Sequence, residues 1–334
     1  MNKMNQTNHS ANEAGTALAR IAHSEYKVNK LLLWASAGIV VAALIGVVFG
    51  TVGDLAIAET VYRPENLFWR VVTALGMFPF LGLYMFYLGT ICRQAVLSHL
   101  SPKKKTLAVI VSACLGLSTA VIGAWSMCRT DTLGAIFPQV VGSIPAIAAG
   151  AVCVMTPLFF VGYFVSKREY DVKFIKQLIV LCVVMAVALY CMEILKLFFC
   201  RPRYRLLLRD IPGITFTPWY KRFAGSAVFV TEYGIDSNDF KSFPSGHTML
   251  AMALIYALPP LARATTGKES HKLPLFAFGT LIAIFVGLSR MFLGAHFLSD
   301  VSMGACISAV FGIIVFAFNL RKSPEESGTS SGLM

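Results

Sequence analysis

The chain has 334 residues, of which 56% are hydrophobic and only 14% are charged, so it has too little polar surface to cover a soluble globule of that size. The net charge of +12 would suggest a nucleic-acid partner in a soluble protein, but the basic residues here fall in short gaps between apolar runs. We therefore expect an integral membrane protein and no nucleic-acid partner.

In chain order, a polar segment comes first, and we predict residues 1–30 to be a cytoplasmic tail. The apolar run that follows is longer than the core of a secretory signal, about 7 to 15 residues, and so predicts an uncleaved transmembrane helix. A membrane span needs about 20 mostly apolar residues. Eight runs fit: 31–52, 71–92, 106–127, 143–165, 175–197, 246–263, 273–291 and 298–319. They predict an all-α fold, a polytopic membrane helix bundle.

Basic residues in five segments give the orientation, because they all fall on one side when eight spans alternate across the membrane. They are Lys27 and Lys30; Arg93 and Lys103 to Lys105; Lys167, Arg168 and Lys173; Arg263, Lys268 and Lys272; and Arg321 and Lys322. The positive-inside rule assigns that side to the cytoplasm. We expect an inner-membrane protein of a bacterium with both termini, including a tail at 320–334, in the cytoplasm.

The long outer segment 198–245 breaks this charge pattern, which suggests that it binds an anion. Its basic residues are Arg201, Arg203, Arg205, Arg209, Lys221, Arg222 and Lys241. A loop of this length can also escape the positive-inside rule without binding an anion. For Arg205, Arg209, Lys221 and Arg222, anion binding and simple escape from the rule are equally favoured. Aromatic residues in the same loop predict either a lid or a plain interfacial anchor; they are Phe216, Trp219, Tyr220 and Phe223.

A first candidate motif lies at the outer end of the fifth span, where Lys196 precedes Arg203 by seven residues. A lysine that snorkels to the interface and the donor fork of an arginine can clamp phosphate oxygens together. The alternative is an interfacial stop with basic flanks. Glu193, one turn before Lys196, predicts a structural ion pair.

The second motif is Ser242-Phe243-Pro244-Ser245-Gly246-His247-Thr248, at the start of the sixth span. A helix start presents unpaired backbone N–H groups and the positive end of the helix dipole, which favour an anion. Gly246 allows close approach, Ser245 donates a hydrogen bond, and His247 supplies a proton. The alternative is a simple capped helix start, which leaves the imidazole unexplained.

The third motif runs from Ser289-Arg290 to His296 and Asp300 at the last outer turn. His296 and Asp300 are four residues apart, so on a helix they share a face and the carboxylate can orient the ring. The alternative is a membrane-buried ion pair. The other four histidines fall in predicted cytoplasmic segments: His9, His23, His99 and His271.

Together the three motifs resemble the signature of the type 2 phosphatidic acid phosphatase superfamily: Lys-x6-Arg-Pro, Pro-Ser-Gly-His and Ser-Arg-x5-His-x3-Asp. The resemblance implies a six-helix phosphatase core at 106–319 with the outer loop 198–245, preceded by two additional helices at 31–105 with no role that we can derive. The sequence departs from the pattern at Tyr204, where the family has proline, while Arg201 precedes Pro202. Arg201 and Arg203 are thus both candidate clamps, and the offset from Lys196 favours Arg203.

The resemblance further implies a metal-independent lipid phosphatase that needs no cofactor. In it, His296 attacks phosphorus, Asp300 holds the attacking ring, and His247 protonates the leaving oxygen, with a phosphohistidine intermediate. The implied phosphate-binding residues are Lys196, Arg203, Ser245, Gly246 and Arg290. Carboxylates of the outer segments are scattered along the sequence instead of grouped for a metal ion: Asp54, Glu59, Glu65, Asp131, Asp210, Glu232, Asp236 and Asp239.

Other functions remain open at this stage. The resemblance implies that the substrate is a lipid phosphate, such as phosphatidic acid, phosphatidylglycerol phosphate, a polyprenyl diphosphate or a lipid A phosphate. The same scaffold also allows transfer of the phosphoryl group to another acceptor, a non-catalytic transporter or binding protein, and a relative of the vanadium haloperoxidases. The sequence does not indicate the oligomeric state.

Overall fold

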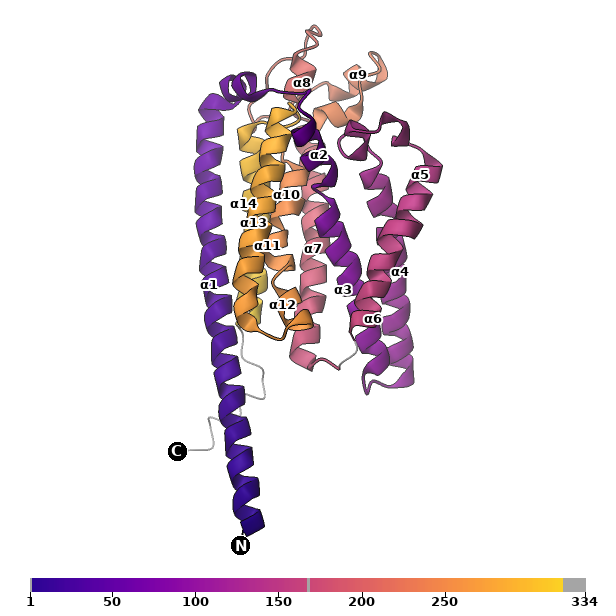
Figure 1. The fold of residues 1–334 in the computed structure, drawn as a ribbon. Coiled ribbons are helices and arrows are strands. Elements are labelled where there is room, and N and C mark those ends of the chain that lie inside the picture. Colours follow the sequence, from indigo (N-terminus) through magenta and orange to yellow (C-terminus); the bar gives the residue numbers. More distant parts are fainter. Residues whose placement is uncertain (1, 167–168, 321–334) are drawn as a thin grey trace.

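The computed structural model describes residues 2–166 and 169–320, with side chains from His23 onward, and every regular element in those ranges is a helix. The long helices lie side by side (Figure 1). Seven helical segments of the described chain are long and apolar enough to cross a membrane. The protein is an integral membrane helix bundle, as the sequence predicts. Four of the orienting basic residues lie outside the described ranges: Lys167, Arg168, Arg321 and Lys322.

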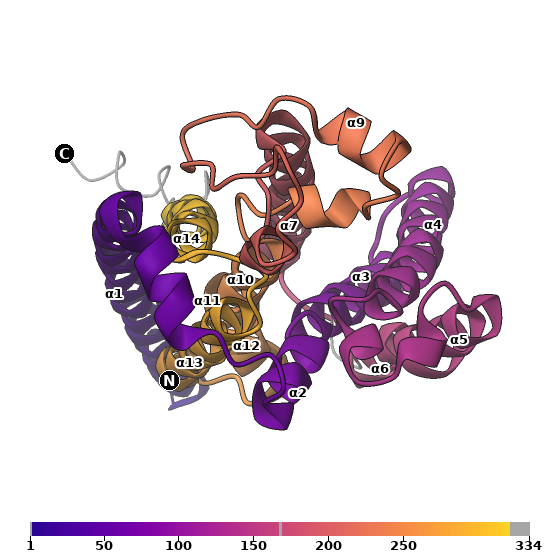
Figure 2. The same cartoon turned by 90° about the horizontal axis from the view of Figure 1, so that it is seen from above.

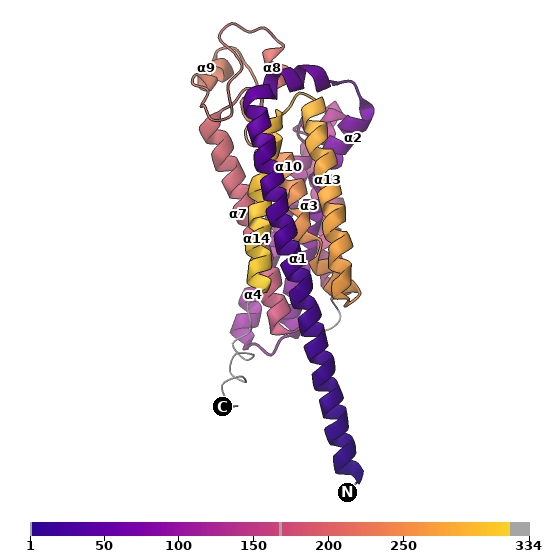
Figure 3. The ribbon, with the colours of Figure 1, turned by 90° about the vertical axis from the view of Figure 1, so that its left-hand side faces the viewer.

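The first helix, α1 (Asn2–Val61), begins well before the predicted span and includes most of the segment expected to be a polar tail. Its N-terminal part contains alanine, glutamate, leucine and arginine, which favour helix even where no apolar face is present. Along the bundle, α1 packs against α14 (Leu298–Asn319), as Figure 3 shows. The contact is close, because a Cβ atom added at Gly50 would lie 2.6 Å from the backbone nitrogen of Ser299.

One side of the bundle is formed by the next three passes, which lie together when the molecule is seen from above (Figure 2). The second pass consists of α2 and α3, the third is α4, and the fourth is a helix interrupted by a π-helical turn. Their bounds are α2 (Leu67–Leu75), α3 (Phe78–Leu97), α4 (Pro102–Met127), α5 (Ile144–Ala149), η3 (Gly150–Met155) and α6 (Thr156–Val165). These passes match the predicted spans to within a few residues.

The sixth predicted span, 246–263, differs from the prediction because it is not one long helix. It is divided into α10 (Gly246–Met252), α11 (Leu254–Ala257) and α12 (Pro260–Thr265), and the stretch Gly246–Ala257 is shorter than a full span. Pro259 and Pro260 stand at its last break, since proline removes a helical hydrogen bond. All of residues 246–258 are buried, so this broken helix forms the centre of the bundle between its neighbours, α7 (Val172–Phe199) and α13 (Lys272–Phe292) among them.

Short elements cover the end of the bundle at which α10 begins. The outer segment there contains α8 (Tyr204–Leu207), α9 (Ser226–Thr231) and η4 (Ser237–Phe240), which lie above the long helices in Figure 1. A small apolar cluster of its own holds this segment together: Leu206, Ile214, Phe223, Ile235 and Phe240. The connection after α4 adds η1 (Leu133–Ala135) and η2 (Pro138–Val140), and η5 (Glu269–His271) precedes α13. The marked N-terminus lies at the opposite end (Figure 1).

Candidate active site

His296 lies fully buried in the short connection between α13 and α14, with its Nδ1 atom 2.6 Å from the carbonyl oxygen of Ser242. A carbonyl oxygen only accepts hydrogen bonds, so Nδ1 must carry the proton. In the neutral ring the lone pair is then on Nε2. Burial lowers the pKa of His296 below its ordinary value, which keeps the ring neutral. The ring is therefore held in the tautomer that a nucleophilic Nε2 requires.

Asp300 stands on the first turn of α14 and faces the same ring, with 3.8 Å between its Oδ2 atom and Nδ1 of His296. Its carboxylate accepts hydrogen bonds from the Ser242 hydroxyl at 2.5 Å and from the Phe297 backbone at 2.8 Å. Arg201 donates to the other oxygen at 2.5 Å. These three donors fix the carboxylate beside the imidazole, where its charge stabilises a positive ring.

His247 and its neighbours form the start of α10, as predicted. Ser245 caps the helix, its hydroxyl lying 2.9 Å from that of Thr248, and its backbone N–H donates to the Asp300 carbonyl at 3.0 Å. This last bond ties the second motif to the third. His247 is 8% exposed and near enough to His296 for the two rings to interact electrostatically.

Gly246 makes room for Lys196 at this helix start. A Cβ atom at Gly246 would lie 2.7 Å from Nζ of Lys196 and 2.4 Å from the sulfur of Met192. The ammonium group therefore sits directly against the first turn of α10. Its ion pair with Glu193, at 3.9 Å, agrees with the structural contact predicted for that residue.

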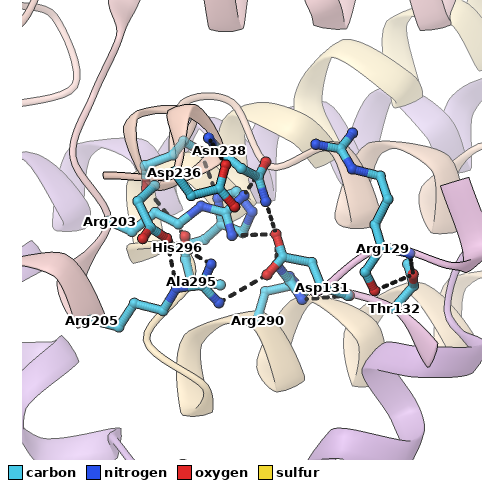
Figure 4. Close-up of polar contacts among 12 residues, drawn as sticks. Arg129, Asp131, Thr132, Arg203, Arg205, Asp236, Asn238, Arg290, Ala295 and His296 are labelled. Atoms are coloured by element: carbon cyan, nitrogen blue, oxygen red, sulfur yellow. Dashed lines mark hydrogen bonds and ion pairs between the residues drawn. The ribbon is translucent and has the colours of Figure 1, made fainter. Parts of the chain in front are cut away.

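Arg203 and Arg290 meet at the carboxylate of Asp131, in the connection after α4 (Figure 4). Arg203 pairs with Asp131 Oδ2 and donates to Asn238 at 3.2 Å, while Arg290 lies 3.5 Å from the same Oδ2 atom. Arg205 adds a third ion pair with Asp131 at 2.9 Å. We call these three arginines the arginine cluster. Burial alone would raise the pKa of Asp131, but Arg203, Arg290 and Arg205 hold it well below its ordinary value of 3.8.

Two arginines of the cluster and the neighbouring His247 have buried nitrogen atoms without partners. Arg203 Nε, Arg290 Nε and His247 Nε2 are buried and have no hydrogen-bond partner within the part of the chain that the structure describes. Buried donors without partners cost free energy, so their presence together indicates a place for a hydrogen-bond acceptor. Since all but the histidine are permanently charged, that acceptor is an anion.

The structure separates the roles of the two arginines that the sequence left open. All three donor nitrogens of Arg201 are engaged, Nε by the Thr217 carbonyl and the two Nη atoms by Asp54, Ser299 and Asp300. Its guanidinium also lies over the ring of Phe297, 4.3 Å from the centroid. Arg203 keeps an Nε without a partner in the described chain, and its role as the phosphate clamp in preference to Arg201 stays a prediction.

The aromatic residues of the outer segment pack against specific partners. Phe216 covers Arg201 and contacts Phe297 edge-on, and Trp219 stacks on Phe243 and donates from its indole N–H to Thr51 on α1 at 2.9 Å. Phe223 belongs to the loop's own apolar cluster, while Tyr220 is exposed. Three of the four therefore have a packing role, and their proposed function as a lid stays a prediction.

Among described side chains, no three His, Cys, Asp or Glu residues come together as a metal-ligand group. The convergent polar groups are the two imidazoles and the cationic donors of Lys196, Arg203 and Arg290.

Comparison with known proteins bears on the same part of the chain. The family model of the PAP2 superfamily matches residues 177–324, which contain all three motifs. This part of the chain is similar to the PAP2 superfamily. The match begins within α7 and omits α1 to α6, so the PAP2 region is narrower than the core predicted at 106–319, and that division stays a prediction.

A curated relative supports the PAP2 assignment. Phosphatidylglycerophosphatase B from Bacillus subtilis is 35% identical to this chain over 80 residues, which are 23% of this chain. The chain spans 39% of the length of that relative. No solved structure gives a significant match.

Three polar residues of this site were not singled out by the PAP2-like motifs. Asp54, Asp131 and Asn238 come from α1, from the connection after α4 and from η4. Little in the sequence indicated that they belong to the site, since an isolated polar residue in a loop or near a helix end is ordinarily exposed to solvent. The surplus of outer arginines was the available clue, because arginines that leave water require anionic partners.

Proposed function

We propose that the protein is a membrane lipid phosphatase that hydrolyses the phosphate monoester or diphosphate of a lipid through a phosphohistidine intermediate. One observation carries the proposal. The imidazole of His296, whose Nδ1 faces a carbonyl oxygen so that its Nε2 can hold the lone pair, stands beside buried arginine donors without partners in the described chain, at one end of a membrane bundle and in its PAP2-like region.

The proposed first step is attack of His296 Nε2 on phosphorus while the bond from phosphorus to the leaving oxygen breaks. His247 gives a proton to that oxygen, so the lipid alcohol or lipid monophosphate leaves with its leaving oxygen protonated. Water then attacks the phosphohistidine, His247 takes the proton of the water, and phosphate and free His296 are regenerated. Asp300 stabilises the positive ring during both steps.

Phosphate binding in this proposal depends on Lys196, Arg203 and Arg290, with the amide of Gly246 at the helix start. Positioned cations stabilise the charge that spreads over the equatorial oxygens in the transition state. Ser245 acts in a more limited way, because its hydroxyl already pairs with Thr248 as a helix cap. The mechanism uses no metal ion.

The substrate class follows from the depth of the site. In this proposal a phosphate held in the headgroup layer reaches the end of α10 from the side of the bundle, so a lipid phosphate is the expected substrate. Phosphatidylglycerol phosphate is the first substrate to test, because the relative from Bacillus subtilis is named for that activity. Phosphatidic acid, a polyprenyl diphosphate and a lipid A phosphate complete the panel, and we place the site on the non-cytoplasmic face.

The decisive experiment measures phosphate release by the purified protein in detergent with each lipid, with and without a chelator. We expect wild type to be active in both conditions and His296→Ala to lose about 1000-fold or more in kcat, the scale for removing a nucleophile. His99→Ala is the matched control, since His99 is exposed and lies in the connection between α3 and α4. Absence of phosphate release from every lipid by wild type would overturn the proposal.

A second measurement tests the role of His247. We expect His247→Ala to lose most of its activity on lipid substrates, but much less on p-nitrophenyl phosphate, whose leaving group departs without a proton. Equal losses on both substrates would contradict a general-acid role. Phosphate that appears on an added lipid alcohol instead of in solution would reveal a phosphotransferase, and binding without turnover would reveal a transporter or binding protein.

A further inference from the structure

The N-terminal helix α1 contributes a buried carboxylate to the surroundings of the site, although it lies outside the region that the PAP2 model matches. Asp54, near the end of α1, is 2% exposed. Its Oδ2 atom lies 2.9 Å from Nη2 of Arg201 and also accepts from the Ser299 hydroxyl. Its Oδ1 atom accepts from the Ser299 backbone at 2.9 Å.

Arg201 links this carboxylate to the one beside the nucleophile. It donates from Nη2 to Asp54 and from Nη1 to Asp300, and the side chains of all three residues are at most 1% exposed. We call Asp54, Arg201 and Asp300 the charge triad. Two carboxylates share one guanidinium, so the charge triad has a net charge of −1.

That net charge matters for His296. When Nε2 bonds to phosphorus, the His296 ring becomes positive. The negative charge of Asp300 stabilises that ring only if no neighbouring cation cancels the charge. Arg201 alone would largely cancel that charge, because the two groups are 2.5 Å apart in a dry environment. Asp54 neutralises Arg201 from the other side and leaves the charge of Asp300 available to the imidazole.

We propose that Asp54 of α1 is a positioning residue for the nucleophile, acting through Arg201 to hold Asp300 in place and preserve its negative charge toward His296. The proposal rests on the proposed phosphatase function and assigns α1 a direct part in it. In the described structure Lys196, Arg203 and Arg290 form their ion pairs with Glu193 and Asp131 and not with the charge triad, so we expect phosphate binding to depend little on Asp54.

The test is a kinetic comparison of Asp54→Asn with wild type on the best lipid substrate. We expect kcat to fall about tenfold, which corresponds to about 1.4 kcal/mol in the barrier, while KM stays within about twofold. Glu59→Gln is the matched control, because it removes the same charge from an exposed position of α1 and leaves both constants unchanged.

A double variant distinguishes an effect of Asp54 through its charge from an effect through packing alone. Asp54→Asn combined with Arg201→Gln restores the net charge of −1 to the triad, since Asp300 alone stays ionised. We expect its kcat to recover part of the loss seen in Asp54→Asn, whereas damage to packing alone would make the double variant worse than either single change.

Several outcomes would overturn this inference while leaving the phosphatase proposal intact. They are an unchanged kcat in Asp54→Asn, an equal rise in KM, and a double variant with lower kcat than Asp54→Asn. If Asp54→Asn and Asp54→Ser both fail to give folded protein by gel filtration while Glu59→Gln folds, Asp54 is a folding residue and the inference is wrong. Inactive wild type, in contrast, would remove the proposed function itself.

Discussion

Asp131 and the arginines around it depend on each other for their burial. Three guanidinium groups packed this closely repel one another, and Asp131 offsets that repulsion with ion pairs to Arg203, Arg205 and Arg290. Asp131 binds one Nη atom of Arg203 and one of Arg290, while the Nε atoms of both arginines and Nη2 of Arg290 have no hydrogen-bond partner in the described chain. Asp131 therefore holds the cluster in place without occupying the donors that we assign to phosphate.

The first prediction is that Asp131→Asn lowers the free energy of unfolding by about 3 kcal/mol, at the lower end of the range for removing one partner of a buried ion pair. The pKa of Asp131 is held well below 3.8 in the folded protein. A carboxyl group with a lowered pKa contributes stability that is fully present above its unfolded pKa, near 3.9, and is lost as the pH falls further. The difference from wild type is thus constant between pH 5 and 8 and shrinks only below about pH 4.

Thermal unfolding in detergent across that pH range measures this difference. Asp210→Asn is the matched control, since Asp210 is exposed and has a positive φ of 47°, which asparagine adopts readily. A difference between Asp131→Asn and wild type that changes steadily from pH 5 to 8 would contradict the assignment of a permanently ionised Asp131.

At the scale of elements, the contact between α1 and α14 requires small residues on one face of α1. Gly46, Gly50 and Asp54 are spaced four apart and face Ser302 and Ser299 of α14. A glycine in a helix is ordinarily a weakness, but here it allows the two backbones to approach. The same approach brings Asp54 within reach of Arg201.

The second prediction is that Gly50→Ala destabilises the protein by about 1–3 kcal/mol, as overpacking does. A Cβ atom there would lie 2.6 Å from the Ser299 nitrogen and 2.8 Å from Oδ1 of Asp54. Gly38→Ala on the same helix is the control, because nothing lies within 4 Å of its Cβ position. We expect Gly38→Ala to leave the melting temperature unchanged or raise it, and a Gly50→Ala variant as stable as this control would contradict the close packing of α1.

Most elements were predictable because a membrane span has a strong signal in its length and apolarity. The three motifs were also readable, since each combines a helix end with unusual polar residues. The break of the sixth span was not predicted, although Pro259 and Pro260 stand in the sequence. Residues 246–258 are buried among other helices, and this tertiary packing, which the sequence does not show, stabilises a helix too short to span a membrane. The contacts of Asp54 and Asp131 were not predictable either, since they join residues more than 70 positions apart through the tertiary fold.

The whole molecule has its charges divided between its two ends. The cluster around Asp131 and the charge triad lie at the end where α10 begins, and the N-terminus lies at the other end (Figure 1). Several arginines at the site end pair with acidic residues: Arg201 with Asp54 and Asp300, and Arg205 and Arg209 with Asp239. Basic residues at the opposite end are paired as well, Lys173 with Glu25 and Lys272 with Glu269, so the expected orientation rests on where the basic segments fall in the sequence.

The third prediction follows from this division and concerns the direction in which the bundle crosses the membrane. We expect a cysteine introduced at Ala224, which is exposed in the outer segment, to react with a membrane-impermeant maleimide in spheroplasts with an intact inner membrane. A cysteine at Lys104, exposed in the first turn of α4, reacts only after the membrane is permeabilised. Labelling of the parent protein, with its own eight cysteines, sets the background for both. The reverse labelling pattern would place the site in the cytoplasm. The five basic segments would then lie on the non-cytoplasmic side, against the positive-inside rule.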